Sequence, residues 1–265
     1  MVRLRVIQWN VSVRSRVDGI GAFLRSLILD ELPTIVCLQE VQEHLYVGLT
    51  EVLRPDGAAY SLAFRSPGKY EGKNRRMGVA ILVFNASIIE AGLLDRTVFP
   101  ERTIWCRAVI FGVPIKIVSF HSLTGVGYKN AKASNFSTIA DYLEQDPALD
   151  FLCFDANEPK TDSKKIRELE FWQGNDKGRN ASLIMGSDKV HSLEDSFRKY
   201  LNESSVHESI QLPITHSTKG IGRRYDYVFS SPIWHVEGIH HPFEESLNAS
   251  SDHSAVVVDF NALND

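Results

Sequence analysis

The sequence reads SSDHSAVVVDF at residues 250–260, and this stretch contains both a predicted strand and ionisable side chains at its start. The run from Ala255 to Val258 is mostly β-branched and wholly apolar, which favours a strand that is buried on both faces. Asp252 and His253 therefore stand at the mouth of that strand. Taken alone, such a pair ends a strand and faces solvent, so the other strand ends must decide its role.

Other apolar runs also end in polar side chains. VIQWN (6–10) ends in Asn10, IVCLQE (35–40) in Glu40, IVSFH (117–121) in His121 and FLCFDAN (151–157) in Asp155 and Asn157, while RYDYVF (224–229) places Asp226 just inside its strand. Ordinary turn residues would more often be Gly, Ser, Lys or Pro. Carboxylates, amides and imidazoles that converge at strand ends are typical of a metal-assisted site built on rigid elements.

Hydrophobic periodicity predicts a chain that is rich in strands and has helices in both halves. We expect strands at 3–9, 34–40, 58–65, 77–84, 103–111, 114–120, 150–154, 225–231, 234–240 and 254–260, and helices at 17–33, 41–53, 130–145, 163–172 and 192–201. The apolar strands need cover on both faces, which two packed sheets with helices outside would provide. Because no linker or change of composition divides the chain, we expect a single domain over residues 1–265.

The composition fits a cytoplasmic globular protein. Hydrophobic residues make up 43% and charged residues 23% of the chain, so a large core can form without disulfides or structural metals. Cys37, Cys106 and Cys153 are an odd number, lie in apolar runs and lack metal-binding spacing, so we expect them to be reduced core residues. No signal-peptide pattern and no membrane-spanning run is present. We expect no membrane association, and no obligate protein partner is evident.

The ordered set QWN, LQE, FHS, DAN, RYDYVF and SDH resembles the endonuclease/exonuclease/phosphatase superfamily, also called the DNase I-like family. The resemblance runs from residue 4 to about residue 260. It implies a four-layer αββα sandwich of the α/β (α+β) class, with two packed mixed sheets flanked by helices. This agrees with the strand pattern. The resemblance also implies hydrolysis of phosphoester bonds with Mg²⁺, or with Mn²⁺ as an alternative.

By this resemblance, Glu40 is the main metal ligand, and Asn10 lies beside it and contacts the metal shell or the phosphate. His253 is the candidate base for the attacking water, because imidazole titrates nearest to neutrality. Asp226 would fix the orientation of the His253 ring. Asp252 would face the metal or a second cation. In isolation, Glu40 and Asn10 also fit a solvated acid and a turn residue.

We expect Asp155 and Asn157 to lie on one side of an extended segment, because side chains alternate with period two. The resemblance implies that Asp155 orients the attacking water or protonates the leaving oxygen, and that Asn157 and His121 donate to the developing charge. Two positions depart from the family pattern. Ser12 replaces an acid, which puts one auxiliary metal contact in doubt, and Phe154 replaces a glycine, which we expect to alter packing near Asp155.

The net charge of −4 disfavours a protein that coats nucleic acid through a broad basic face. Two local basic segments, GKYEGKNRRMG (68–78) and STKGIGRRYDY (217–227), instead suggest loops that clamp a polyanion and stack a base. Solvated turns are the alternative interpretation. The expected nucleic-acid-binding residues are Lys69, Tyr70, Lys73, Arg75, Arg76, Arg223 and Arg224.

The first functional hypothesis is an Mg²⁺-dependent phosphodiesterase that acts on nucleic acid, as a DNA endonuclease, exonuclease or end-processing enzyme. WNVS, LQEV and SFHS also resemble the branch that hydrolyses tyrosyl-DNA linkages. A phosphoinositide phosphatase or a sphingomyelinase-like phosphodiesterase is the alternative, although no aromatic-rich hairpin for membrane docking is evident. A non-catalytic scaffold is a further alternative, and the complete set of candidate residues argues against it.

Overall fold

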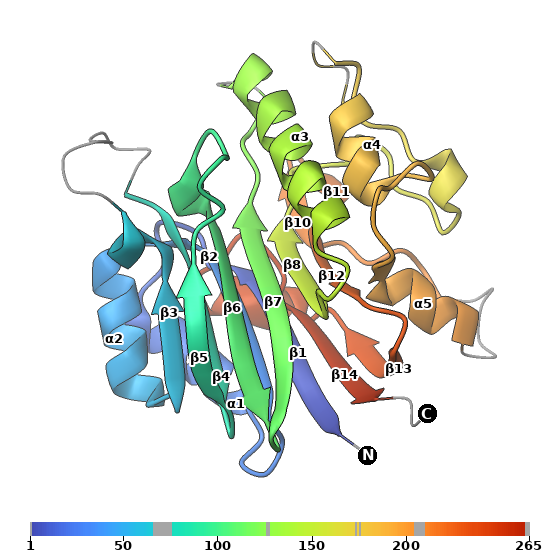
Figure 1. Ribbon diagram of the computed structural model, residues 1–265. Helices are drawn as coiled ribbons and strands as arrows, with labels where there is room; N and C mark the ends of the chain where they lie inside the picture. Colours follow the sequence, from blue (N-terminus) through green and yellow to red (C-terminus); the bar gives the residue numbers. More distant parts are fainter. Residues whose placement is uncertain are drawn as a thin grey trace.

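The computed structural model describes residues 2–65, 76–125, 128–172, 174, 176–203 and 210–262, and contains two six-stranded mixed sheets (Figure 1). The first sheet has the order β13 (Trp234–His240), β14 (Val256–Ala262), β1 (Arg3–Asn10), β2 (Thr34–Val41), β4 (Gly78–Phe84) and β3 (Gly57–Tyr60). The second has the order β5 (Ser87–Gly92), β6 (Thr103–Ile110), β7 (Val113–His121), β8 (Phe151–Asp155), β12 (Asp226–Ser230) and β9 (Glu194–Asp195). The pairs β1–β2 and β7–β8 are parallel, and the other strand pairs are antiparallel. A separate hairpin joins β10 (His216–Thr218) to β11 (Ile221–Arg223).

Helices cover the outer face of each sheet. Apolar side chains of α1 (Val17–Leu27) and α2 (Glu43–Leu53) pack with those of β1 and β2 on the outside of the first sheet. Those of α3 (Lys129–Gln145) and α4 (Arg179–Met185) pack with β7, β8 and β12 on the outside of the second. A third cluster fills the space between the sheets. The predicted αββα sandwich is therefore confirmed.

The inner face of each sheet changes from apolar to polar along its strands, and this change positions the site. In β1, Leu4 and Val6 enter the core between the sheets, and Gln8 and Asn10 follow on the same face because side chains alternate with period two. The same change occurs in three strands of the second sheet, from Ile115 and Ile117 to Ser119 and His121, from Phe151 and Cys153 to Asp155, and from Val228 back to Asp226. One end of the interior is therefore apolar and the other is a polar cluster.

Several sequence-based boundaries need correction. The helix expected at 163–172 is wrong, because that stretch forms only the 3₁₀ turn η4 (Ile166–Glu168) beside a bridge between Thr161 and Glu170. The strand expected at 58–65 ends at Tyr60 and continues as a 3₁₀ turn, η1 (Ser61–Phe64). The expected helix at 192–201 is α5 (Ser196–Glu203), and β5, α4 and α6 (Phe243–Asn248) were not predicted. Of the described residues, no helix is both long and apolar enough to cross a bilayer.

The three cysteines are free and buried, as the sequence predicted. All three belong to the apolar cluster between the sheets. Burial raises the pKa of the thiols of Cys37 and Cys106. They contribute packing to the core, and neutral thiols are poor nucleophiles.

Candidate active site

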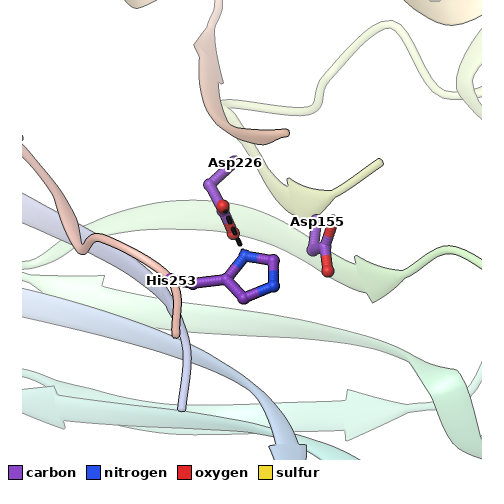
Figure 2. Close-up of side chains that lie close together, drawn as sticks. All are labelled: Asp155, Asp226 and His253. Carbon is purple, nitrogen blue, oxygen red and sulfur yellow. Dashed lines mark hydrogen bonds and ion pairs between the residues drawn. The ribbon is translucent and has the colours of Figure 1, made fainter. Parts of the chain in front are cut away.

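The centre of the polar cluster is an ion pair between His253 and Asp226 (Figure 2). Nδ1 of His253 lies 2.8 Å from Oδ2 of Asp226. The other carboxylate oxygen, Oδ1, accepts a hydrogen bond of 3.1 Å from Nε2 of Gln8. Asp226 is only 1% exposed, so these two partners take the place of water around its charge. The arrangement fixes one imidazole nitrogen and leaves Nε2 for other partners.

A relay of buried amides supports Asp226, and the sequence analysis missed it. Oε1 of Gln8 accepts a hydrogen bond of 2.6 Å from Nε2 of Gln39, which also lies 3.0 Å from the hydroxyl of Ser119. Gln8, Gln39 and Ser119 are fully buried. The sequence could have indicated these three residues, because each comes two positions after an apolar residue on the inner face of its strand.

The backbone around His253 is also held in place. The carbonyl of His253 accepts a 2.9 Å hydrogen bond from Nε1 of Trp9, and its N–H donates to the hydroxyl of Ser251 at 3.0 Å. That hydroxyl in turn donates to the carbonyl of Asn10 at 2.6 Å. These contacts fix the ring so that it lies between Asp226 and Asp155 (Figure 2). Potential ligand atoms of Asp155, Asp226 and His253 lie within 4.8 Å of one another.

Asp155 joins several of the predicted residues. Its Oδ2 accepts a 2.9 Å hydrogen bond from Nδ2 of Asn10, and its Oδ1 accepts one of 2.9 Å from the backbone N–H of Asn157. Nε2 of His121 lies 3.6 Å from Oδ2. Asn157 follows β8 in a left-handed conformation, with φ of 48°, which turns the chain back toward the carboxylate. The DAN triplet thus forms a closed local unit.

Glu40 lies on the solvent side of this cluster. It has a φ of 58° at an irregularity in the pairing of β2 with β4, which turns its side chain out of the strand register. Its Oε2 accepts a hydrogen bond of 2.9 Å from the N–H of Val13, and its Oε1 lies 3.7 Å from Nε2 of His121. The side chain is 22% exposed. Glu40 therefore offers a carboxylate edge that solvent and ligands can reach.

Arg102 is a further member of the site that sequence reasoning missed. It ends the 3₁₀ turn η3 (Pro100–Arg102), is 4% exposed and places Nη1 3.4 Å from Nδ1 of His121. Burial lowers the pKa of its guanidinium, while the charges of Glu40 and Asp155 oppose that shift. Its tripeptide, PER, lies in a connection before β6 and follows no periodic pattern. Its place beside His121 depends on tertiary packing alone.

Burial and mutual charge shift the pKa values of the site strongly. Burial opposes a charge on His253, yet the carboxylates of Asp226 and Asp155 outweigh it and raise the pKa of His253 to about 10. Burial raises the pKa of Asp155 to about 7, against the opposing charge of His253. Burial, Arg102 and His253 hold the pKa of His121 well below its ordinary value. At neutral pH the cluster thus holds a protonated His253 beside a neutral His121.

The donor set suits a hard divalent cation. Mg²⁺ prefers oxygen ligands and keeps several waters, so one or two carboxylates beside solvent suffice. Glu40 offers such an edge, and the carboxylates of Glu40 and Asp155 both lie near Nε2 of His121, at 3.7 and 3.6 Å. Burial raises the pKa of Asp155, and a cation beside the carboxylate would favour its charged form. The residues present therefore fit a bound metal ion.

Asp252 and the basic residues differ in how they relate to this cluster. Asp252 is exposed, and its backbone carbonyl lies 3.0 Å from Nδ1 of His216. The structure does not bring its carboxylate into the group formed by Asp155, Asp226 and His253.

Arg76 is exposed just before β4, and Arg223 is partly exposed on the β10–β11 hairpin. Four predicted residues, Lys69, Tyr70, Lys73 and Arg75, lie outside the described residues.

Arg224 does not fit its expected role in binding nucleic acid. It is 2% exposed, and its guanidinium lies 2.7 Å from Asp162 and 2.6 Å from Asp195. Arg198 contacts both of these acids. A guanidinium that is buried and paired with two buried carboxylates is not accessible to a polyanion. Arg224 is instead part of a buried ion-pair network with Asp162, Asp195 and Arg198.

The two departures from the family pattern are accommodated differently. Phe154 does not pack against Asp155 as expected, because adjacent residues of a strand point to opposite faces. Its ring stacks on Phe120 at 4.7 Å and on Tyr227 at 5.3 Å, in the layer beneath α3. Ser12 donates its N–H to Oδ1 of Asn10 at 3.0 Å and so orients that amide.

Comparisons with solved structures show the same fold. The structure is similar to humanized TDP2 of D. rerio, with a TM-score of 0.69, 14% identity and coverage of 98% of this chain and 99% of that chain. It is similar to the catalytic domain of human Nocturnin, with a TM-score of 0.66, 18% identity and coverage of 98% and 95%. An endonuclease/exonuclease/phosphatase family protein of Bacteroides thetaiotaomicron has a TM-score of 0.61, 18% identity and coverage of 98% and 97%. No family model and no curated protein matches the sequence. At these identities, the likeness shows a shared fold and nothing more.

Proposed function

We propose that this protein is a divalent-metal-dependent phosphodiesterase that hydrolyses nucleic acid, with DNA as its substrate, as an endonuclease, an exonuclease or an end-processing enzyme. One observation carries the proposal. The ion pair between His253 and Asp226 lies against Asp155, whose carboxylate also binds Asn10 and Asn157. A positioned imidazole, a buried acid and an accessible carboxylate are the groups that hydrolysis of a phosphodiester requires.

The contacts suggest a role for each side chain. Asp226 holds the His253 ring through Nδ1, so Nε2 is the atom that takes the proton from an attacking water when the ring is in its neutral form. Asp155, with a pKa of about 7, can keep a proton at neutral pH and give it to the leaving oxygen. Asn157 and His121 lie against Asp155, where they can donate to the non-bridging oxygens of the phosphate.

A metal ion would be held by Glu40, with Asn10 and Asp155 beside it. We propose Mg²⁺, with Mn²⁺ as the alternative, because both accept carboxylate and water ligands. When bound, such an ion supplies positive charge to the phosphate and makes a bound water more acidic. A cation among these carboxylates would also compete with the proton on His253, so we expect loading to lower the pKa of His253.

Nucleic acid is the favoured substrate class for two reasons. One of the similar solved structures is D. rerio TDP2 in complex with a single-strand DNA product, at 14% identity and a TM-score of 0.67. In this chain, Arg76 and Arg223 remain accessible to a polyanion. The proposed binding roles of Lys69, Tyr70, Lys73 and Arg75 stay predictions.

A panel of substrates tests the proposal. The protein should be incubated with plasmid, single-stranded DNA, RNA and inositol phosphates, in Mg²⁺, in Mn²⁺ and in EDTA. We expect DNA cleavage that EDTA abolishes and that His253→Ala reduces by orders of magnitude, while His44→Ala, at an exposed imidazole on α2, retains it. Turnover of inositol phosphates without DNA cleavage would favour the phosphoinositide phosphatase, and no hydrolysis at all would favour a scaffold.

A further inference from the structure

A stack of rings leads outward from His253 to the β10–β11 hairpin. The ring of His216 stacks on that of His253 with centroids 4.3 Å apart and an interplanar angle of 22°. On its other side His216 stacks on Tyr225 at 5.9 Å and 25°. Tyr225 is buried, and its hydroxyl lies close enough to the side chain of Trp172 to interact with it. The catalytic imidazole is thus linked to an exposed indole through two intervening rings.

The hairpin is fixed to the catalytic segment by Thr215. Its carbonyl accepts a 2.7 Å hydrogen bond from Ser254, and its N–H donates to the carbonyl of Arg223 at 2.8 Å. Its hydroxyl accepts from the N–H groups of Tyr225 at 2.8 Å and Asp226 at 3.1 Å. Thr215 is fully buried. The hairpin therefore holds a defined position relative to His253 and Asp226.

At the outer end of the stack, Arg223 lies over Trp172. Its guanidinium carbon is 5.0 Å from the centre of the Trp172 ring, and its Nη1 donates to the carbonyl of Lys160. Arg223 pairs with His216 across the hairpin. Trp172 is 40% exposed, and its backbone N–H donates a 2.9 Å hydrogen bond to the carboxylate of buried Glu158. The pair forms a flat, cationic and accessible surface that adjoins the catalytic centre.

A groove of about 430 Å³ has Arg223 of this pair in its lining. Its lining includes Pro159, Lys160, Ile214, Ile221 and Arg223. Ile214 is 47% and Ile221 is 56% exposed, so these two side chains present apolar surface without a partner in the described structure. Flat apolar surface beside two cationic side chains matches the chemistry of a base joined to a phosphate.

We propose that Trp172 and Arg223 form a subsite that stacks the nucleobase of a nucleotide next to the scissile phosphate. The inference rests on the proposed hydrolysis of nucleic acid and names the contact that selects its substrate. A guanidinium stacked on an indole offers a plane for the base and N–H donors for the adjoining phosphate. The subsite discriminates nucleotides that carry a base from those that lack one.

Binding measurements in EDTA, which prevents turnover, test the subsite directly. The probes are a labelled ten-residue oligothymidylate and an abasic oligonucleotide of the same length and charge. We expect Trp172→Ala to weaken oligothymidylate binding about 10-fold, to leave binding of the abasic probe unchanged, and Trp172→Phe to restore most of the affinity. Phe111→Ala is the matched control, because Phe111 is 70% exposed at the β6–β7 turn, at the other end of β7 from His121.

Hydrolysis provides the second readout. On oligothymidylate, Trp172→Ala should raise KM about 10-fold and leave kcat within about twofold, because Trp172 binds the base and does not contact the reacting atoms. If Trp172→Ala fails to fold, Arg223→Gln replaces it, with a similar expected loss.

The outcomes separate the two proposals. In one outcome, hydrolysis requires His253 and Glu40, but Trp172→Ala and Arg223→Gln bind both probes like the wild type. That outcome would overturn the subsite and leave the proposed hydrolysis standing. A loss of oligothymidylate binding confined to these variants, in a protein that hydrolyses no phosphodiester, would keep the subsite and overturn the proposed hydrolysis. Equal weakening of both probes would show that Trp172 supports the structure and does not stack a base.

Discussion

Nδ1 of His253 lies 2.8 Å from Oδ2 of Asp226, and the two residues come from different sheets. Asp226 begins β12 of the second sheet, and His253 stands just before β14 of the first. The other contacts of the site also cross between the sheets, and they join Gln8 to Asp226, Asn10 to Asp155, Gln39 to Ser119 and Glu40 to His121. The candidate site therefore exists only while the two sheets are packed together.

Replacing Asp226 should change how His253 titrates. The nearby carboxylates raise the pKa of His253 to about 10 against the effect of burial, and Asp226 has the largest effect among them. We expect Asp226→Asn to lower the pKa of His253, because burial still disfavours the charged ring. An NMR titration of ¹⁵N-labelled histidine in the metal-free protein measures this shift.

Asp252→Asn is the matched control for that titration. Asp252 is exposed, and its charge contributes less to the pKa of His253 than those of Asp226 and Asp155. Its removal should therefore lower the pKa of His253 much less. An equal shift in the two variants would show that the ion pair does not dominate the protonation of His253.

Glu40→Gln should weaken metal binding without unfolding the protein. The side chain is 22% exposed, and it keeps an oxygen for the N–H of Val13 after the change. Loss of the charge should raise the Mg²⁺ concentration for half-maximal activity at least 10-fold, and calorimetric titration with Mn²⁺ should show the same loss. Glu43→Gln, at an exposed acid of α2, is the control. Unchanged metal affinity in Glu40→Gln would remove Glu40 from the metal site.

Phe154→Ala should affect stability and leave the chemistry intact. The ring is fully buried in the outer layer of the second sheet, and its removal leaves a cavity beside Phe120. We expect a loss of about 3–5 kcal/mol in the free energy of unfolding, measured with urea. Activity per folded molecule should stay within about twofold, because Asp155 points to the opposite face. Wild-type stability with a large loss of activity would show that Phe154 shapes the pocket after all.

The sequence permitted prediction of those parts of the site that continue a strand. Asn10, Asp155 and Asp226 occupy inner-face positions of strands whose apolar residues already define that face. Period-two alternation extended in the same way would also have indicated Gln8 and Gln39 as buried polar residues. The two sheets and the helices that cover them followed from the same patterns.

The remaining site residues depend on how loops pack, and periodicity carries no information about that. Arg102 comes from a 3₁₀ turn, and His216 comes from a short hairpin that the local pattern did not distinguish from a turn. The local sequence of Arg224 is that of an exposed basic turn, but its guanidinium is paired with Asp162 and Asp195. Sequence separations of 62 and 29 residues join these partners, so only tertiary structure brings them together.

Arg224→Met tests whether this network is structural. Removing the guanidinium leaves Asp162 and Asp195 with Arg198 as their common cation. We expect a loss of about 3–5 kcal/mol in the free energy of unfolding, because breaking a buried pair leaves uncompensated charge. Arg223→Met, one residue earlier and partly exposed, should cost less than about 1 kcal/mol. Urea unfolding of both variants measures the difference, and equal losses would contradict a specific role for Arg224.

His241 should make the protein less stable in mild acid. Burial and the charge of Arg224 lower its pKa from 6.5 to about 3. Below pH 6.5 the unfolded chain therefore binds a proton that the folded protein does not, and stability falls as the pH drops toward 3. Above pH 6.5 neither state is protonated and the contribution is complete. His191, with a pKa lowered to about 4 by burial and Lys189, acts with the same sign.

His241→Phe isolates this contribution, because the aromatic ring retains the edge contact with Phe197 at 6.0 Å and cannot titrate. Carboxylates also lose their pairing in acid, so the informative quantity is the difference between variant and wild type. Between pH 7 and pH 5, the free energy of unfolding measured with urea should fall less for His241→Phe than for the wild type. The difference between the two decreases should be up to about 1.4 kcal/mol per pH unit. Equal decreases in the two proteins would mean that His241 is protonated in the folded state, which the cation of Arg224 and the buried surroundings of the ring should prevent.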